Sequence, residues 1–188
     1  KFSMQHIYDA KEGEVFWAAS DVGWVVGHSY IVYGPLLNRN TTILFEGKPI
    51  RTPDASTFWR VINEHKVNVM FTAPTAIRAI KKEDPNGEFI KQCDVATLEW
   101  YREHIPIPAI DHWWQTESGW PMIANMMGVE YLPIKPGSAG KAVTGYDIRI
   151  FGENGQELGP NEEGYVVIKL PLPPGTLLDL WKDNERFK

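Results

Sequence analysis

Cysteine, long apolar runs and positive charge are all scarce in this chain, and each shortage excludes a class of protein. The single cysteine, Cys93, cannot form an intrachain disulfide and fits a reducing compartment. The nearest candidate for a membrane span, Val25 to Leu37, falls short of the about 18 apolar residues required and is interrupted by polar residues and proline. We therefore expect neither a disulfide framework nor insertion into a membrane.

Charge and histidine spacing exclude two further classes. Lys and Arg number 19 against 24 Asp and Glu, and the net charge of −5 disfavours nucleic-acid binding, which usually needs a basic face. The five histidines show no metal-ligand spacing, so we expect no zinc site. Lys1 is neither an initiator methionine nor the start of a signal peptide, which predicts a chain taken from a longer one.

The first half of the chain alternates between strand and helix patterns. Strands are predicted over Glu14–Ala19, Thr41–Phe45 and Val67–Thr72 from their short apolar runs. Between the second and third strands, Thr52-Pro53-Asp54 supplies helix-start residues, and a helical stripe runs from Phe58 to His65. Strand, helix and strand at this spacing form a βαβ crossover, which predicts a parallel pair.

The second half changes its period. Helices are predicted over Thr75–Lys82 and Thr97–His104, and a strand over Ile107–Asp111. From Tyr146 the apolar residues alternate, and Tyr146–Phe151 and Gly164–Leu170 flank a turn, which is typical of a β-hairpin. The sequence therefore predicts an α/β fold whose helix-flanked, mainly parallel sheet is followed by an antiparallel β region from roughly residue 145.

The run Asp111–Pro121 is the most informative segment of the sequence. Two adjacent tryptophans precede an amide, a hydroxyl and a carboxylate, which together offer stacking surface, hydrogen bonds and a potential magnesium-facing oxygen. The apolar run 105–110 just upstream predicts a buried strand, and ligands bind outside the carboxyl ends of such strands in open α/β sheets. The alternative is two core tryptophans followed by a solvated loop.

This run resembles the nucleotide-binding motif of short-chain acyl-CoA synthetases, members of the acyl-adenylate-forming superfamily. Three more segments resemble the same subfamily, in the same order: Ala19–Tyr30, Phe71–Arg78 and Val167–Gly175. The resemblance covers essentially the whole chain and implies part of the large N-terminal domain. It makes residues 1–145 the central sheet of the AMP-binding domain and 146–188 the start of a β-barrel-like subdomain. The phosphate loop upstream and the small C-terminal domain are absent.

The resemblance implies an activity of the complete protein. Such enzymes join a short carboxylic acid to coenzyme A: ATP adenylates the acid, and the CoA thiol then displaces AMP. The expected ligands are ATP, Mg²⁺, CoA and a small carboxylate, with no nucleic-acid partner. The expected compartment is the cytoplasm or the mitochondrial matrix, and the oligomeric state stays open.

The resemblance also assigns the nucleotide site. Six consecutive residues line the adenine, ribose and α-phosphate pocket: Asp111, His112, Trp113, Trp114, Gln115 and Thr116. The catalytic pair is Thr116, whose hydroxyl contacts the α-phosphate, and Glu117, whose carboxylate faces magnesium. A hydroxyl beside a carboxylate suits a metal–phosphate pair. Taken alone, Glu117 is better explained as a solvated acid.

Three apolar residues are assigned to the acyl pocket. Trp114 resembles the indole that closes this pocket to long acids, and Val25 and Val26 form the opposite wall. Acetate-type members usually have threonine at the position of Val26, whereas propionate-type members have valine, so propionate is favoured. One methylene is worth only about 1–3 kcal/mol in an apolar pocket. The alternative is that the two valines are core residues.

One internal departure from the family stands out. Between Gln92 and Cys93 the family has a further strand with an adenine-covering turn, and we expect the natural protein to contain it, because its loss would leave unpaired backbone groups. Two other functions stay open: acetate or another small acid as the main substrate, and a non-catalytic module that binds a glycan or peptide on its eight tryptophans. The spread of the tryptophans through core-like contexts disfavours the second.

Overall fold

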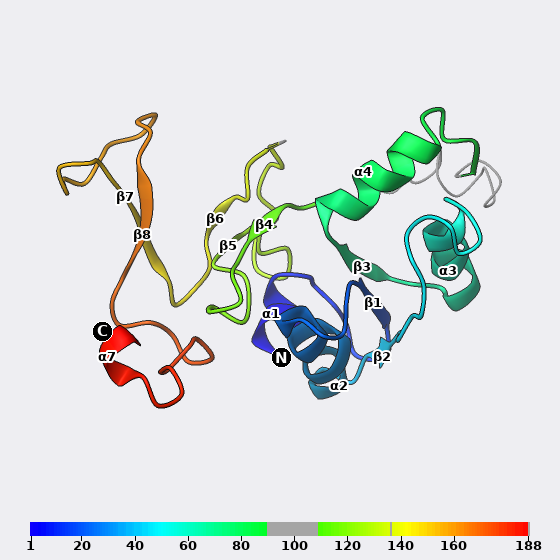
Figure 1. Ribbon diagram of the computed structural model, residues 1–188, viewed down its shortest axis with the longest axis horizontal. Coiled ribbons are helices and arrows are strands. Elements are labelled where there is room, and N and C mark those ends of the chain that lie inside the picture. The colour runs from blue at the N-terminus through cyan, green and yellow to red at the C-terminus, as the bar shows by residue number, and fades with distance from the viewer. Residues whose placement is uncertain (90–108, 136, 188) are drawn as a thin grey trace. The chain divides into compact units, whose positions relative to one another are not determined.

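The computed structural model describes residues 1–89, 109–135 and 137–187, and these divide into two compact units (Figure 1). The first unit comprises Lys1–Ala109 with Met127–Val129, and the second comprises Ile110–Met126 with Glu130–Lys188. Among the described residues, no helix is both long enough and apolar enough to span a membrane.

A parallel sheet forms the centre of the first unit. Strand β1 (Val15–Ala19) lies between β2 (Thr41–Thr42) and β3 (Val69–Thr72), and both neighbours run parallel to it. The crossover from β2 through α3 to β3 joins parallel strands of one sheet, as predicted, but β2 and β3 do not form the predicted pair, because β1 lies between them. The prediction that the second strand extends to Phe45 is wrong. The Ile43 amide still donates to the Phe16 carbonyl at 3.4 Å, and beyond it the apolar pattern reflects packing of Ile43 and Phe45 against the core near Trp17.

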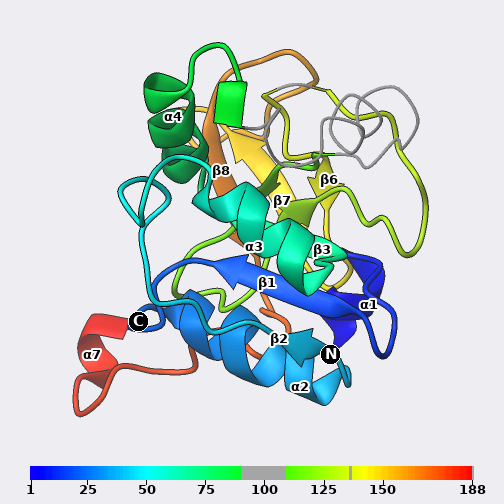
Figure 2. The ribbon, with the colours of Figure 1, turned by 90° about the vertical axis from the view of Figure 1, so that its right-hand side faces the viewer.

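Helices cover both faces of this sheet. Successive side chains of β1 point in opposite directions, so its apolar residues offer a packing surface on each face. Trp17 packs at 5.0 Å from Phe58 of α3 (Thr57–His65). Phe16 faces the other way, toward Tyr8 and Tyr30, beside α1 (Phe2–His6). Figure 2 shows α3 and α2 (Gly34–Leu37) flanking β1 on opposite sides.

Helix starts follow the predictions in one case and depart from them in another. Helix α4 (Pro74–Glu83) begins with proline at its first turn, which confirms the predicted helix. Helix α3 begins at Thr57, and the prediction that Thr52-Pro53-Asp54 caps it directly is wrong. The Asp54 carboxylate instead accepts a hydrogen bond from the Ser56 amide at 2.8 Å, which forms a separate turn just before the helix.

The second unit is built from short antiparallel pairings. Three strands of two residues each are ordered β4-β5-β6: His112–Trp113, Ile123–Ala124 and Lys141–Ala142. Strands β7 (Asp147–Phe151) and β8 (Tyr165–Lys169) pair along their full length, which confirms the predicted hairpin. A short helix, α7 (Asn184–Phe187), follows.

The start of the antiparallel region differs from the prediction, and some elements predicted upstream of it lie outside the described residues. Antiparallel pairing begins at His112 and not near residue 145, because strands of two residues are too short to show an alternating pattern. The helix predicted over Thr97–His104 lies outside the described residues, as do the first two residues of the strand predicted over Ile107–Asp111. The described part, Ala109–Asp111, is irregular.

Candidate functional site

The run Asp111–Pro121 contains β4 and most of the hairpin turn that connects β4 to β5. Trp113 pairs with Ile123, and the Met122 amide donates to the Trp113 carbonyl at 2.9 Å. The polar residues therefore lie in the turn of an antiparallel pair, rather than directly after the parallel strand that the sequence predicted. A turn exposes consecutive side chains, whereas a strand directs every second one inward.

Ser118 stabilises this turn from the inside. Its side chain is buried, and its hydroxyl accepts from the Gln115 amide at 3.0 Å. The same oxygen lies 2.8 Å from the Gln115 carbonyl and 2.9 Å from the Trp120 carbonyl, to which it can donate. One buried hydroxyl thus ties both ends of the turn, so Ser118 acts as the structural clamp of the predicted site.

A distant segment supports the same turn. The Leu177 amide donates to the Glu117 carbonyl at 2.8 Å. Gly119 has a φ of +72°, and a Cβ there would lie 2.9 Å from the Gly175 carbonyl oxygen, so only glycine fits. Sequence analysis did not assign a role to Ser118 or Gly119. The available signal was their position directly after the predicted catalytic pair.

The predicted ligand-binding side chains divide into two groups by exposure. Trp113 and Trp114 are half-buried at the base of the turn, whereas Gln115, Thr116 and Glu117 are exposed at its tip. The backbone of the turn is held by hydrogen bonds to buried groups, which leaves these three polar side chains available to a ligand. The turn therefore combines an aromatic base with a solvent-facing amide, hydroxyl and carboxylate.

His112 is neutral at physiological pH. Burial lowers its pKa to about 4, although the nearby Asp111 carboxylate opposes part of this shift. Asp111 itself accepts a hydrogen bond from the His112 amide at 2.8 Å. A neutral imidazole beside two indoles suits contact with an uncharged ring better than contact with a phosphate.

Trp120 and Tyr146 form an aromatic support within the same unit. Their rings lie 5.2 Å apart, and burial raises the pKa of Tyr146 to about 12. A hollow of about 400 Å³ also lies in this unit, on the β7–β8 hairpin, where Arg149, Phe151 and Lys169 contribute to its lining. None of the predicted site residues lines that hollow.

The two predicted valines begin a helix in the first unit. Val25 is half-buried and Val26 is 5% exposed, and the helix continues through the π-helical segment η1 (Gly27–Tyr33) into α2. Trp114 belongs to the second unit. The acyl pocket that would combine the three residues therefore stays a prediction.

The residues present fit magnesium in one specific way. Within the described ranges, His, Cys, Asp and Glu side chains form no group of three that could hold a metal ion. Mg²⁺ usually needs only one or two carboxylates when substrate phosphates and water complete its octahedron. The exposed Glu117 could supply one such carboxylate next to a bound triphosphate.

Comparison with known proteins identifies the class. The model of the AMP-binding enzyme family matches residues 1–173, and the chain belongs to this family. It is 51% identical to the mitochondrial acyl-CoA synthetase short-chain family member 3 of Mus musculus, over all of this chain and 30% of that protein. It is 43% identical to the propionate–CoA ligase of Salmonella typhimurium, over 98% of this chain and 32% of that protein.

A solved structure supports the fold. The crystal structure of a Brucella canis acyl-CoA synthetase matches with a TM-score of 0.71 and 30% identity, over 88% of this chain and 32% of that one. The chain thus spans about a third of the length of these relatives. The mouse alignment runs over 203 residues against the 188 of this chain, so this relative has residues with no counterpart here. The additional strand expected between Gln92 and Cys93 lies outside the described residues and stays a prediction.

Proposed function

We propose that this chain is the central portion of an ATP-dependent synthetase that joins a short carboxylic acid, preferably propionate, to coenzyme A. The observation that carries the proposal is the turn of the second unit. It presents the hydroxyl of Thr116 and the carboxylate of Glu117 to solvent directly after two half-buried tryptophans. Membership of the AMP-binding enzyme family supplies the chemical context.

The reaction has two steps in this proposal. The acid carboxylate attacks the α-phosphorus of ATP, and pyrophosphate leaves; the CoA thiol then attacks the acyl carbon, and AMP leaves. Negative charge develops on phosphate oxygens in the first step, where hydrogen-bond donors and cations are most effective. Bound magnesium would supply charge stabilisation there.

The turn residues take distinct roles. The Thr116 hydroxyl donates a hydrogen bond to the α-phosphate, and Glu117 provides a carboxylate that faces the metal ion. The neutral His112 and the indoles of Trp113 and Trp114 suit the adenine and ribose. Asp111 and Gln115 add polar groups at the two ends of this pocket. Ser118 keeps the backbone of the turn in place, so that the two catalytic side chains need not be ordered by the ligand.

Substrate size is set by Trp114 together with Val25 and Val26. The indole limits the length of the acid, and a valine in place of a threonine keeps the wall apolar, which favours propionate over acetate. A preference for acetate or another small acid is the second candidate. The bacterial relative named propionate–CoA ligase supports the first candidate.

A glycan- or peptide-binding module fits the structure less well. Such modules need several aromatic rings on one exposed surface. The most exposed tryptophans that the structure describes are Trp24 and Trp181, at 66% and 87%, and they belong to different units. Trp17 is fully buried in the core.

The decisive experiment uses the full-length protein that contains this chain. It is incubated with ATP, Mg²⁺, CoA and acetate, propionate or butyrate, and acyl-CoA, AMP and pyrophosphate are quantified. The proposal expects all three products in equal amounts, with the highest kcat/KM for propionate. Release of ADP instead of AMP, or no thioester with any acid, would contradict it. A higher kcat/KM for acetate would retain the reaction and change only the preferred acid.

A further inference from the structure

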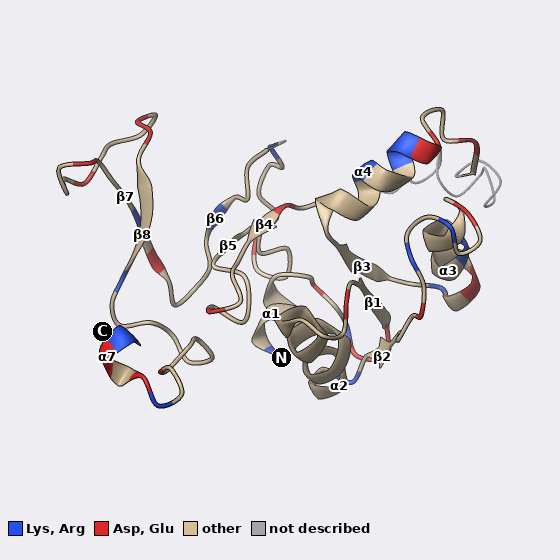
Figure 3. Ribbon diagram, viewed as in Figure 1, with Lys and Arg blue, Asp and Glu red and all other residues tan. Residues whose placement is uncertain are grey.

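The helix that begins at Val25 has an unusual middle. Between Gly27 and Tyr33 its hydrogen bonds run from residue i to i+5, which defines a π-helix. Such segments are rare in proteins, and those that occur are often found at functional sites. No charged residue occurs between Val22 and Asn38, and Figure 3 shows α2 without charge accordingly. Its position must therefore be set by packing and by neutral hydrogen bonds.

Pro35 explains why the helix widens here. Proline has no N–H, and its ring clashes with the carbonyl four residues earlier, which is that of Ile31. The Thr42 hydroxyl instead donates to the Ile31 carbonyl at 2.7 Å. The Gly34 amide donates to the Ser29 carbonyl, and a Cβ on Gly34 would approach that oxygen to 2.3 Å. The widened turn is thus accommodated by a threonine on β2 and by a glycine.

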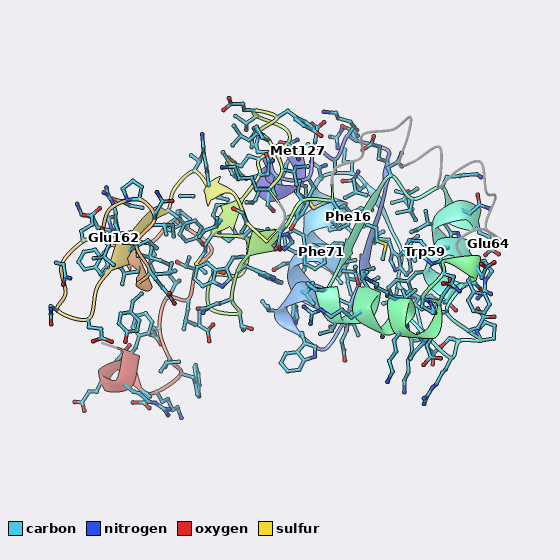
Figure 4. All side chains as sticks on the ribbon, turned by 90° about the horizontal axis from the view of Figure 1, so that it is seen from above. Phe16, Trp59, Glu64, Phe71, Met127 and Glu162 are labelled. Carbon is cyan, nitrogen blue, oxygen red and sulfur yellow. The ribbon has the colours of Figure 1, made fainter. Side chains whose placement is uncertain are left out.

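Tyr30 is the residue of the π-helix that anchors it to the rest of the first unit. It is 1% exposed, and its ring stacks on Phe71 of β3 at 5.3 Å and 22°. Its hydroxyl donates to the buried Ser3 hydroxyl of α1 at 3.0 Å. Phe16 lies 6.4 Å away on the same face of the sheet, and Figure 4 labels Phe16 and Phe71 in this region.

Tyr30 lies one helical turn after Val25 and Val26. In a helix, a residue four or five positions later occupies nearly the same face in the next turn. A shift of Tyr30 relative to α1 and β3 therefore moves the two valines with it. The half-buried Val25 and the buried Val26 have no polar side-chain groups with which to hold their own position.

We infer that Tyr30 is a positioning residue for acyl-chain selection: its hydrogen bond to Ser3 and its stack on Phe71 determine where Val25 and Val26 stand. This inference rests on the proposed function, because it assigns the valines to the acyl pocket. It predicts that specificity depends on a phenol that does not touch the acid.

The test compares single-atom deletions in the full-length protein. Tyr30→Phe removes the hydroxyl and keeps the ring on Phe71, and Ser3→Ala removes the other partner of the same hydrogen bond. Tyr33→Phe is the matched control, since Tyr33 belongs to the same π-helix but is 58% exposed. For each protein, kcat and KM are measured for acetate, propionate and butyrate, together with KM for ATP and the thermal unfolding temperature.

Tyr30→Phe and Ser3→Ala are each expected to lower the propionate-to-butyrate ratio of kcat/KM about three- to tenfold. This effect is smaller than the discrimination of about 10- to 200-fold that an enzyme gains from one methylene of its substrate. The change should appear in KM for the acid, with KM for ATP unaltered. The double variant should behave like Tyr30→Phe alone, because Tyr30→Phe removes the hydroxyl that bonds both Ser3 and Tyr8, whereas Ser3→Ala removes only the bond to Ser3. Tyr33→Phe should leave the ratio as in the wild type.

Several outcomes would overturn the inference. A wild-type ratio in both Tyr30→Phe and Ser3→Ala, with active enzyme, overturns it and leaves the proposed function intact. A parallel loss of activity with all three acids and a lower unfolding temperature shows a purely structural role. If Tyr30→Phe does not fold, Ser3→Ala decides alone. Absence of thioester formation by the wild type overturns the proposed function, and this inference with it.

Discussion

The helix that carries Val25 and Val26 and the turn that carries Thr116 and Glu117 are stabilised in opposite ways. The helix contacts the sheet through buried aromatic rings, such as Tyr30, and its valines are wholly or partly buried. The turn is held by hydrogen bonds between its backbone and the buried Ser118 hydroxyl, and the side chains that we propose as catalytic, Thr116 and Glu117, are exposed. Chain-length selection needs a rigid apolar wall, whereas phosphate and metal chemistry needs polar groups that a ligand can reach.

This difference separates the expected consequences of mutation. Changes in the helix should act through packing, and should therefore alter which acid is preferred. Changes at the tip of the turn should alter the rate with every acid alike. Changes in the buried part of the turn should affect both the rate and the stability.

The largest effect is expected for the carboxylate at the tip of the turn. Glu117→Gln in the full-length protein should lower kcat about 100- to 1000-fold with every acid, because it removes the carboxylate that we propose holds the magnesium ion beside the reacting phosphate. The acid preference and the unfolding temperature should stay unchanged. Glu153→Gln, at an exposed position of the same unit, is the control. Wild-type kcat in Glu117→Gln would assign Glu117 to the solvated surface.

The next effect concerns the indole at the base of the turn. Trp114→Gly should raise the relative kcat/KM for butyrate and longer acids and lower propionate turnover, with ratios changing about 10- to 200-fold. Val26→Thr should instead shift the ratio toward acetate by making the wall polar. Chain-length profiles at saturating ATP and CoA measure both. An unchanged profile in a folded Trp114→Gly protein would make Trp114 a packing residue.

The clamp inside the turn should give an intermediate effect. Ser118→Ala removes the hydroxyl that bonds the Gln115 amide and the Trp120 carbonyl, and each such hydrogen bond contributes about 0.5–1.5 kcal/mol. We expect kcat to fall about tenfold, because the turn no longer holds Thr116 and Glu117 in one arrangement. Steady-state kinetics and urea unfolding measure the two effects. Ser138→Ala, at an exposed position, is the control, and equal kinetics in the two variants would rule out a clamping role.

The smallest effect at neutral pH comes from His112. Its pKa is about 4 in the folded protein, against 6.5 in an unfolded chain. The unfolded state therefore binds more protons between these values, so the stabilisation is complete above about pH 6.5 and is lost as the pH falls toward 4. His112→Gln should flatten the slope of unfolding free energy against pH in this window. A slope identical to that of the wild type would show that His112 is not buried.

The sequence by itself determined the parts that depend on local pattern. The parallel crossover around β1, the start of α4 at Pro74 and the β7–β8 hairpin all follow from apolar period and turn residues. The segment Asp111–Pro121 stood out through its composition alone, because two adjacent tryptophans followed by an amide, a hydroxyl and a carboxylate combine stacking surface with hydrogen-bonding groups. Such features involve residues that are neighbours in sequence.

Tertiary structure alone decided the features that depend on distant residues. Thr42 reaches the Ile31 carbonyl, Ser3 reaches Tyr30, and Leu177 reaches the turn at Glu117. The apolar residues near Phe45 pack without extending β2, and two-residue strands carry no period to detect. The physical reason is the same throughout. A backbone or hydroxyl group must find a partner wherever the fold buries it, and only the folded chain determines which partner is near.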